Sequence, residues 1–282
     1  MRRLFVALLA SFLAMPLSAQ FLPQLRSGEA GAGLRDMADA TEARQWRAVG
    51  RLDTGISFCS ATLIAPDLVL TAAHCVFHPE THARLNPEDF SFLAGLRNGR
   101  AEAIRQVRRA AIMPGYRHER GPDLDMIGLD LALLELRQPV SPASIPAIAA
   151  SGSLNEDGLV TVISYGEDRE AYASIEEGCE ILAAQGLVRS LSCEVVRGAS
   201  GAPILRVEQG RPEVVAVMSA IGLVDGENVS LAVMLDGQVD TLLEQFDAEA
   251  PVATFTTRGG STTFISPSSD TRDSIGARFV RP

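Results

Sequence analysis

Residues 60–75 read Ser-Ala-Thr-Leu-Ile-Ala-Pro-Asp-Leu-Val-Leu-Thr-Ala-Ala-His-Cys and carry the clearest strand pattern in the chain. Two short apolar runs, 61–65 and 68–71, flank the turn-forming pair Pro66-Asp67, which predicts two strands joined by a tight turn. Similar β-rich runs recur at 159–163, 202–207 and 214–217, each bounded by Gly, Pro, Asp or Asn. Repeated short strands without alternating helices predict an all-β sandwich or barrel.

The composition is that of a globular protein and limits the class of partner. Of 282 residues, 46% are hydrophobic and 21% are charged, which leaves ample apolar material for a core. The formal charge is −10, and every basic residue is arginine because the chain has no lysine. An acidic chain repels phosphate backbones, so we expect no nucleic acid partner. The composition does not determine the oligomeric state.

The N-terminus has the pattern of an export signal. Arg2 and Arg3 precede the apolar run 4–13, and Leu17-Ser18-Ala19 offers small residues for cleavage after Ala19. The apolar run is shorter than the ~20 residues that a spanning helix needs. We therefore expect residues 1–19 to be a signal peptide, the protein to be secreted or periplasmic, and no stable membrane insertion after cleavage.

The remaining chain divides by composition into three parts. Residues 20–44 are polar and are expected to be a linker or pro-segment, with ordered structure beginning near Trp46. All-β barrels commonly reach roughly 200–250 residues as one domain, so 45–246 is expected to be a single domain. Residues 247–282 form a polar tail that is expected to be disordered; the alternative is a hairpin around Gly259-Gly260.

Two segments have helical character. Residues 101–111 are charged with scattered apolar positions, a pattern that fits either a helix or a pair of strands. Residues 236–246 place four apolar side chains at helical spacing, which predicts an amphipathic helix. These side chains are Val239, Leu242, Leu243 and Phe246.

The chain contains four cysteines: Cys59, Cys75, Cys179 and Cys193. An even number in an exported chain predicts two disulfides, and four cysteines allow three connectivities. The local option, with each cysteine joined to its neighbour in sequence, closes loops of about 15 residues worth ~3 kcal/mol each. Neither neighbouring pair has the CxxC spacing of a zinc or redox motif.

The segment Gly198-Ala199-Ser200-Gly201-Ala202-Pro203 has the residue types of a nucleophilic serine turn. A nucleophilic hydroxyl needs an exposed position on a tight turn, with backbone N–H groups free to bind an oxyanion. Glycines on both sides permit that turn and the approach of a substrate carbonyl. Serine and glycine also populate many ordinary loops.

His74 is the second candidate, because the small residues before it allow close packing and Cys75 can fix it through a disulfide. A structural histidine is the ordinary alternative. His74, His78 and His82 are also spaced to align three metal ligands on one helix, but Pro79 would break that helix, so no metal site is expected. His118 reads as a solvated loop residue.

Asp130 is the third candidate. It lies in the apolar run Leu129-Asp130-Leu131-Ala132-Leu133-Leu134, where a carboxylate is costly to bury without a partner. Accepting the N–H of a catalytic histidine gives such a carboxylate a role. An edge position facing water is the alternative. Asp123 and Asp125, in a turn-like segment nearby, are alternative candidates for the same role, and Asp125 is the stronger of the two.

Together, these blocks resemble the chymotrypsin-like serine peptidases over residues 46–246. The segments 60–64, 70–75, 130–134 and 198–203 match the signature blocks of that family, and the order His, Asp, Ser is the order of its triad. The resemblance implies two six-stranded antiparallel β-barrels with the site between them. With the helix expected at 236–246, the fold is all-β with a C-terminal helix. The resemblance also implies pairing of Cys59 with Cys75 and a triad of His74, Asp130 and Ser200.

The family's chemistry follows from that resemblance. Ser200 is the expected nucleophile, and the N–H groups of Gly198 and Ser200 are the expected oxyanion hole. The implied substrates are proteins or peptides, and no metal or organic cofactor is implied. The alternatives are a catalytically weak protein of the same fold that binds or regulates, and an esterase using the same serine.

The chain also departs from the animal digestive members of the family. Those members place Asp before the catalytic serine to pair with a newly cut N-terminal amine, whereas this chain has Ala199. Residues 48–51 read Ala-Val-Gly-Arg in place of Ile-Val-Gly-Gly. Both departures, with Cys193 close before the serine block, are more similar to the bacterial glutamyl-endopeptidase branch, and activation through a new N-terminus is not expected.

Substrate preference is only weakly indicated. Glu194 lies six residues before Ser200, where trypsin-type members place the acid that binds basic side chains. The resemblance further implies a substrate-pairing strip near Met218, Ser219 and Ala220. A glutamate-specific pocket would want a cationic group there, which Met218 does not supply. The sequence therefore selects neither preference.

Overall fold

The computed structural model describes residues 33–37, 39–118, 123–150, 152, 158–167, 169–224, 227–248, 253–257 and 260–264. The expected signal peptide at 1–19 lies outside the described residues. Among the residues that are described, no helix combines the length and apolar character needed to cross a bilayer.

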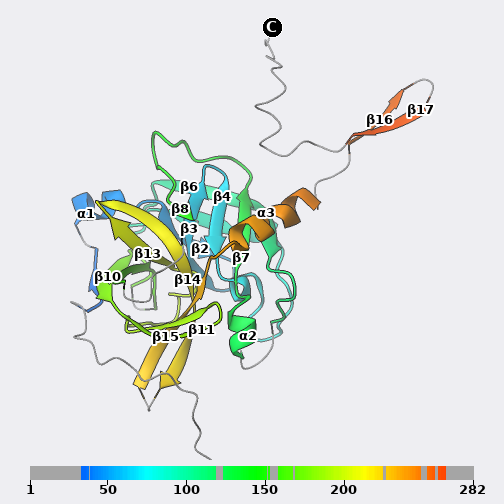
Figure 1. Ribbon diagram of the computed structural model, residues 1–282. Coiled ribbons are helices and arrows are strands. Elements are labelled where there is room, and N and C mark those ends of the chain that lie inside the picture. Colours follow the sequence, from blue (N-terminus) through cyan, green and yellow to red (C-terminus); the bar gives the residue numbers. More distant parts are fainter. Residues whose placement is uncertain are drawn as a thin grey trace, which may run out of the picture.

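Six antiparallel strands close the first barrel (Figure 1), in the order β2-β3-β4-β7-β6-β5. The expected turn at Pro66-Asp67 joins β3 to β4. The interior is filled by fully buried apolar side chains, among them Leu52, Leu63 and Phe92. The strands are β2 (Val49–Asp53), β3 (Phe58–Ala65), β4 (Leu68–Thr71), β5 (Ser91–Ala94), β6 (Ala103–Ile112) and β7 (Ala132–Leu136).

The second half of the molecule is a nine-stranded sheet in which most neighbouring strands are antiparallel. Its strands are β1 (Arg35–Asp36), β8 (Ala149–Ala150), β9 (Val160–Ser164), β10 (Ser174–Cys179), β11 (Ile181–Gln185), β12 (Val188–Leu191), β13 (Pro203–Glu208), β14 (Arg211–Val224) and β15 (Glu227–Met234).

β10 and β11 together act as one bent strand that closes this sheet into a barrel. β10 pairs with β9, β11 pairs with β12, and only Glu180 separates β10 from β11. Glu180 continues the ladder, because its carbonyl accepts the N–H of Ser192 at 3.0 Å. Counted as one strand, β10 and β11 complete a six-membered ring with β12, β15, β14, β13 and β9. The expected fold of two six-stranded barrels is confirmed.

The chain is ordered earlier than expected. Before Trp46 the structure contains β1 and a short helix α1 (Ala40–Gln45), which Asp39 caps through its side chain. β1 pairs with β10, and the buried Met37 donates its N–H to the Ala173 carbonyl at 3.0 Å. The expectation that order begins near Trp46 is therefore wrong, because the pairing partner of β1 lies about 140 residues away in sequence.

The helical interpretation of 101–111 is also wrong, since 103–112 forms the single strand β6. Val107, Ala110 and Ala111 are buried, while Ile104 stays exposed. A register shift between Val107 and Arg109 breaks the alternation, so the apolar positions imitate helical spacing. Pairing with β5 and β7 on both sides overrides that local pattern.

The expected C-terminal helix is confirmed as α3 (Gln238–Ala248), which packs against β6 and β7 (Figure 1). Leu242 and Phe246 are buried, and Arg109 of β6 lies 4.6 Å from the Phe246 ring. Beyond α3, the strands β16 (Ala253–Thr257) and β17 (Gly260–Phe264) pair as a hairpin, the alternative to the expected disordered tail.

Candidate active site

His74 lies at the end of the first barrel, on a short 3-10 helix (Ala73–Val76) that follows β4 directly. The next residue, Cys75, is joined by a disulfide to Cys59 on β3, and this bond fixes the helix to the barrel wall. The helix ends at Val76, so His78 and His82 do not continue it. The three histidines are therefore not aligned as metal ligands on one helix.

Asp130 lies between α2 (Leu124–Ile127) and β7, and it is only 3% exposed. One carboxylate oxygen accepts the backbone N–H of His74 at 2.8 Å, and the other is 2.7 Å from His74 Nδ1. Asp125, the rival candidate, is an exposed residue of helix α2. The structure brings Asp130, not Asp125, to the histidine.

The two side chains shift each other's pKa. Burial alone would lower the pKa of His74, but the charge and hydrogen bond of Asp130 outweigh it and raise that pKa. Burial alone would raise the pKa of Asp130, but His74 and the hydrogen bond from Ser219 lower it. The pair therefore favours a charged imidazolium beside a carboxylate.

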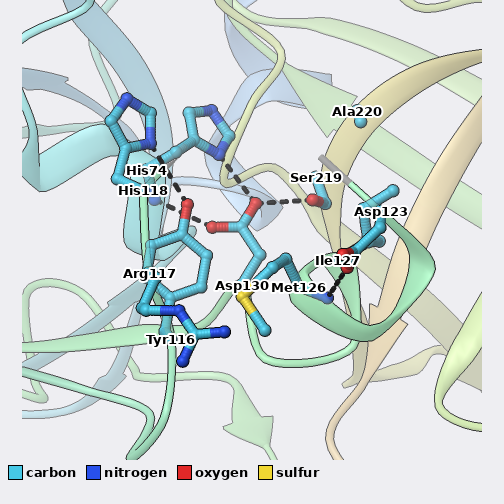
Figure 2. A pocket seen from close by; sticks show the side chains of 10 residues that line it. All are labelled: His74, Tyr116, Arg117, His118, Asp123, Met126, Ile127, Asp130, Ser219 and Ala220. Carbon is cyan, nitrogen blue, oxygen red and sulfur yellow. Dashed lines mark hydrogen bonds and ion pairs between the residues drawn. The ribbon is translucent and has the colours of Figure 1, made fainter. Parts of the chain in front are cut away.

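Ser219 hydrogen-bonds to the Asp130 carboxylate and Tyr116 lies near it in the same cavity wall, and sequence reasoning missed both roles (Figure 2). The Ser219 hydroxyl donates a hydrogen bond to Oδ2. Burial, followed by the charge and hydrogen bonding of Asp130, raises the pKa of Tyr116 far above its usual range. Ser219 is 89 residues from Asp130, and no local pattern marks such a contact.

Ser200 lies on the turn that enters β13, at the interface between the barrels. Its carbonyl accepts the N–H of Ser60 on β3 at 2.8 Å, which ties the turn to the first barrel. The neighbouring Gly201 has a φ of +79°, and a Cβ there would collide with Thr71 and with the Ser60 carbonyl. Only glycine allows this approach, as the sequence pattern anticipated.

Gly198 has a φ of +90° and packs against the ring of Phe58, so glycine is again required. Ala199 is buried, and its N–H donates to the Val196 carbonyl. Among the described residues, the side-chain hydrogen bonds of His74 run to Asp130 and Cys75 and none reaches Ser200. The structure thus pairs His74 with Asp130 and holds Ser200 on a turn fixed to the same barrel.

A cavity of about 220 Å³ opens beside this pair (Figure 2). Its walls combine the polar site residues with the apolar side chains of α2. The lining residues are His74, Tyr116, Arg117, His118, Asp123, Met126, Ile127, Asp130, Ser219 and Ala220.

His118 belongs to this wall and is not the solvated loop residue that was expected. Its ring stacks on Phe77 with centroids 5.0 Å apart, and its Nδ1 lies 3.3 Å from the Tyr116 hydroxyl. Burial, together with the neighbouring charge of His74, lowers the pKa of His118.

The residues expected to bind substrate occupy different environments. Met218 is 1% exposed, and its backbone N–H and carbonyl both bond to the serine turn. Substrate pairing by the backbone strip near Met218, Ser219 and Ala220 stays a prediction. Ala220 lines the cavity, whereas the Ser219 side chain faces Asp130. Glu194 is exposed, and its N–H donates to the Glu176 carboxylate at 2.7 Å.

The second disulfide joins Cys179 at the end of β10 to Cys193, so both cysteine pairs are the local ones. Within the described part of the chain, the two groupings of metal-type side chains each contain a disulfide pair. Oxidised sulfurs are not thiolate ligands, and these groupings therefore do not form a metal site of the usual kind.

Two antiparallel barrels with a half-buried histidine held by a buried aspartate at their interface define the class of trypsin-like serine peptidases. The chain matches the trypsin-like peptidase domain over residues 59–217 and belongs to that family.

Relatives support the same class. Coagulation factor XII of Sus scrofa is 28% identical over 147 residues, which are 47% of this chain and 23% of that protein. A modular serine protease of Drosophila melanogaster is 38% identical over 111 residues, or 36% of this chain and 17% of that protein. The chain thus matches less than a quarter of the length of either relative.

A solved glutamyl endopeptidase, in complex with MPD, has the same fold. It superposes with a TM-score of 0.63 at 17% identity, covering 79% of this chain and 99% of that protein. The similarity in fold therefore extends over nearly the whole of that solved chain.

Proposed function

We propose that this protein is an exported serine endopeptidase whose triad is His74, Asp130 and Ser200. The observation that carries the proposal is the His74–Asp130 pair. Asp130 is buried, accepts two hydrogen bonds from His74 and one from Ser219, and raises the pKa of the imidazole. This arrangement suits a general base that must hold a proton for part of the reaction.

In the proposed reaction, Ser200 Oγ attacks the carbonyl carbon of a peptide bond while its proton passes to His74 Nε2. The N–H groups of Gly198 and Ser200 donate hydrogen bonds to the oxyanion, each worth ~3 kcal/mol in the transition state. The C–N bond then breaks as His74 returns the proton to the leaving nitrogen, leaving an acyl ester on Ser200. Water, deprotonated by His74, hydrolyses that ester and regenerates the serine.

Covalent labelling tests the nucleophile. A fluorophosphonate probe should label the purified protein and fail to label Ser200→Ala, whereas Ser141→Ala, an exposed serine, should label normally. Equal labelling of the wild type and Ser200→Ala, or no labelling at all, would refute the proposal.

A peptide-library digest then separates a peptidase from an esterase. Cleavage of internal amide bonds supports the endopeptidase, while hydrolysis of ester substrates alone would favour an esterase. The proposed export is tested on secreted material by mass spectrometry of its N-terminus, which should begin at Gln20.

A further inference from the structure

The strand β14 has an open edge where it leaves the serine turn. β13 pairs with β14 only as far as Val217, and Met218 makes backbone hydrogen bonds of 2.8 Å to Gly201 and Ala202 of the turn. Beyond Met218, among the described residues, β14 pairs only with β15 (Figure 1). The other edge of 219–224 therefore begins directly beside the turn that carries Ser200, and no described strand pairs with it.

The pairing register shows which residues face this open edge. Val224 and Glu227 pair across a two-residue connection, and such a connection closes on a hydrogen-bonded pair. Hydrogen-bonded and non-hydrogen-bonded pairs alternate along an antiparallel ladder, and no register shift interrupts this ladder between Ala220 and Val224. The backbone N–H and C=O groups of Ile221 and Leu223 therefore point away from β15, toward the open edge.

The open edge lacks the residues that usually protect an exposed strand. Residues 219–224 read Ser-Ala-Ile-Gly-Leu-Val, with no charged residue and no proline, whereas natural edge strands commonly carry one or the other. The side chains of Ile221 and Leu223 share one face of the strand and are 49% and 73% exposed. An edge of this kind can pair with an extended chain and cover apolar side chains of that chain.

We propose that the edge of β14 from Ile221 to Leu223 binds the acyl side of a peptide substrate as an added strand, out to the fifth residue before the scissile bond. Met218 is the last residue of β14 bonded to the serine turn, so Ser219 is the first that a substrate residue can oppose. With the residue before the scissile bond opposite Ser219, the third lies opposite Ile221 and the fifth opposite Leu223. The inference rests on the proposed function, because it requires a peptide whose scissile carbonyl is at Ser200.

The direction of β14 selects the acyl side of the substrate. β14 runs away from the serine turn, whereas the acyl side of a substrate runs toward Ser200, so the two chains are antiparallel. β13 and β15 also pair with β14 in antiparallel fashion, and parallel pairs are slightly less stable per residue.

This arrangement also predicts the sequence that the edge prefers. Ile221 and Leu223 each exchange two backbone hydrogen bonds with the substrate, and their side chains lie beside those of the third and fifth substrate residues. The edge therefore favours unfolded segments with apolar residues at these two positions.

The first test compares kcat/KM for two acetylated peptides built on the cleaved sequence that the library digest selects. One peptide keeps three residues before the scissile bond and the other keeps five, with valine at the third and fifth positions. The longer peptide should be cleaved roughly 5-fold to 50-fold more efficiently by the wild type, because it gains two hydrogen bonds to Leu223.

N-methylation of the longer peptide tests the register with the wild-type protein. The amide of the fifth residue donates to the Leu223 carbonyl, so its N-methylation should lower kcat/KM roughly threefold to tenfold. The amide of the fourth residue faces away from β14, and its N-methylation is the control that should change kcat/KM little.

Leu223→Pro tests the same contact from the protein side, because proline removes an N–H that faces the open edge, where an edge strand tolerates it. Asn228→Pro is the matched control, since Asn228 opposes Leu223 in the same hairpin and its N–H faces away from β14. The ratio of kcat/KM for the long and short peptides cancels any general loss of activity. This ratio should fall roughly threefold to tenfold in Leu223→Pro and keep its wild-type value in Asn228→Pro. If Leu223→Pro folds poorly, the N-methylated peptides still decide the question.

Equal kcat/KM for the long and short peptides, or equal losses on N-methylation of the fourth and fifth residues, would overturn the inference. A second copy of the chain is the other occupant of such an edge. A dimer in analytical ultracentrifugation that Leu223→Pro dissociates, with no change in the peptide ratio, would therefore also overturn it. Failure of the proposed function is distinct, because the wild-type protein would then neither label with fluorophosphonate nor cleave either peptide.

Discussion

Replacing Asp130 with asparagine tests the proposed triad most directly, because the change keeps the size of the side chain and removes one acceptor. The carboxylate accepts the His74 N–H on one oxygen and contacts both His74 Nδ1 and Ser219 on the other. Asparagine offers a single oxygen, and its NH₂ group cannot accept. If that oxygen keeps the backbone bond, the NH₂ group faces the imidazole and favours the wrong tautomer.

The magnitude follows from the bonds that are lost. Two charge-assisted hydrogen bonds on Oδ2 disappear, each with a net value of about 1.5–3 kcal/mol. Their sum is roughly 3–6 kcal/mol, and 1.36 kcal/mol corresponds to a tenfold change in rate. We therefore expect Asp130→Asn to lower kcat by roughly 10²-fold to 10⁴-fold.

The assay is the rate of fluorophosphonate labelling, followed by steady-state hydrolysis of whichever peptide the library digest selects. Asp125→Asn, at an exposed position of helix α2, is the control and should label at the wild-type rate. Asp130→Asn should keep its fold by circular dichroism while its labelling rate falls. A folded Asp130→Asn variant that labels within threefold of the wild type would show that Asp130 does not orient the base.

Three further outcomes follow from the same structure. Replacing both cysteines of the first-barrel disulfide by alanine should cost ~3 kcal/mol and lower Tm by roughly 6–12 °C; an unchanged calorimetric Tm would contradict that bond's role. Gly201→Ala should cost roughly 2–5 kcal/mol in urea unfolding, from positive φ and steric overlap. Gly210 also has a positive φ, but a Cβ there would meet open space, so Gly210→Ala should lose only the stability that the backbone strain costs. Equal losses of stability in the two variants would rule out steric overlap at Gly201. Ser219→Ala should lower kcat/KM roughly fivefold to tenfold and shift the acid limb of its pH profile to higher pH. The reason is that Asp130, without that hydrogen bond, attracts the proton of His74 more strongly, and activity requires neutral His74. An acid limb at the wild-type pH would contradict the coupling of Ser219 to His74 through Asp130.

Much of the fold could be predicted because its signals are local. The turn at Pro66-Asp67 and helix α3 each depend on residues close together in sequence. The cysteine count left three pairings open, and the structure selects the local one. β6 was misread for the same reason: its register shift gave a strand the apolar spacing of a helix. β1 was missed because two residues carry no periodicity, and the strand exists only through its partner β10.

The sequence by itself singled out the candidate residues for the proposed chemistry: a serine flanked by glycines, a histidine beside a cysteine, and an aspartate in an apolar run. Only the tertiary structure decided which side chains meet. Met218 and Ser219 are neighbours on β14, yet one is buried against the serine turn and the other bonds to Asp130. Successive residues on a strand face opposite sides, and β14 shifts register between Met218 and Ala220, so strand pairing fixed which of the two reaches the site.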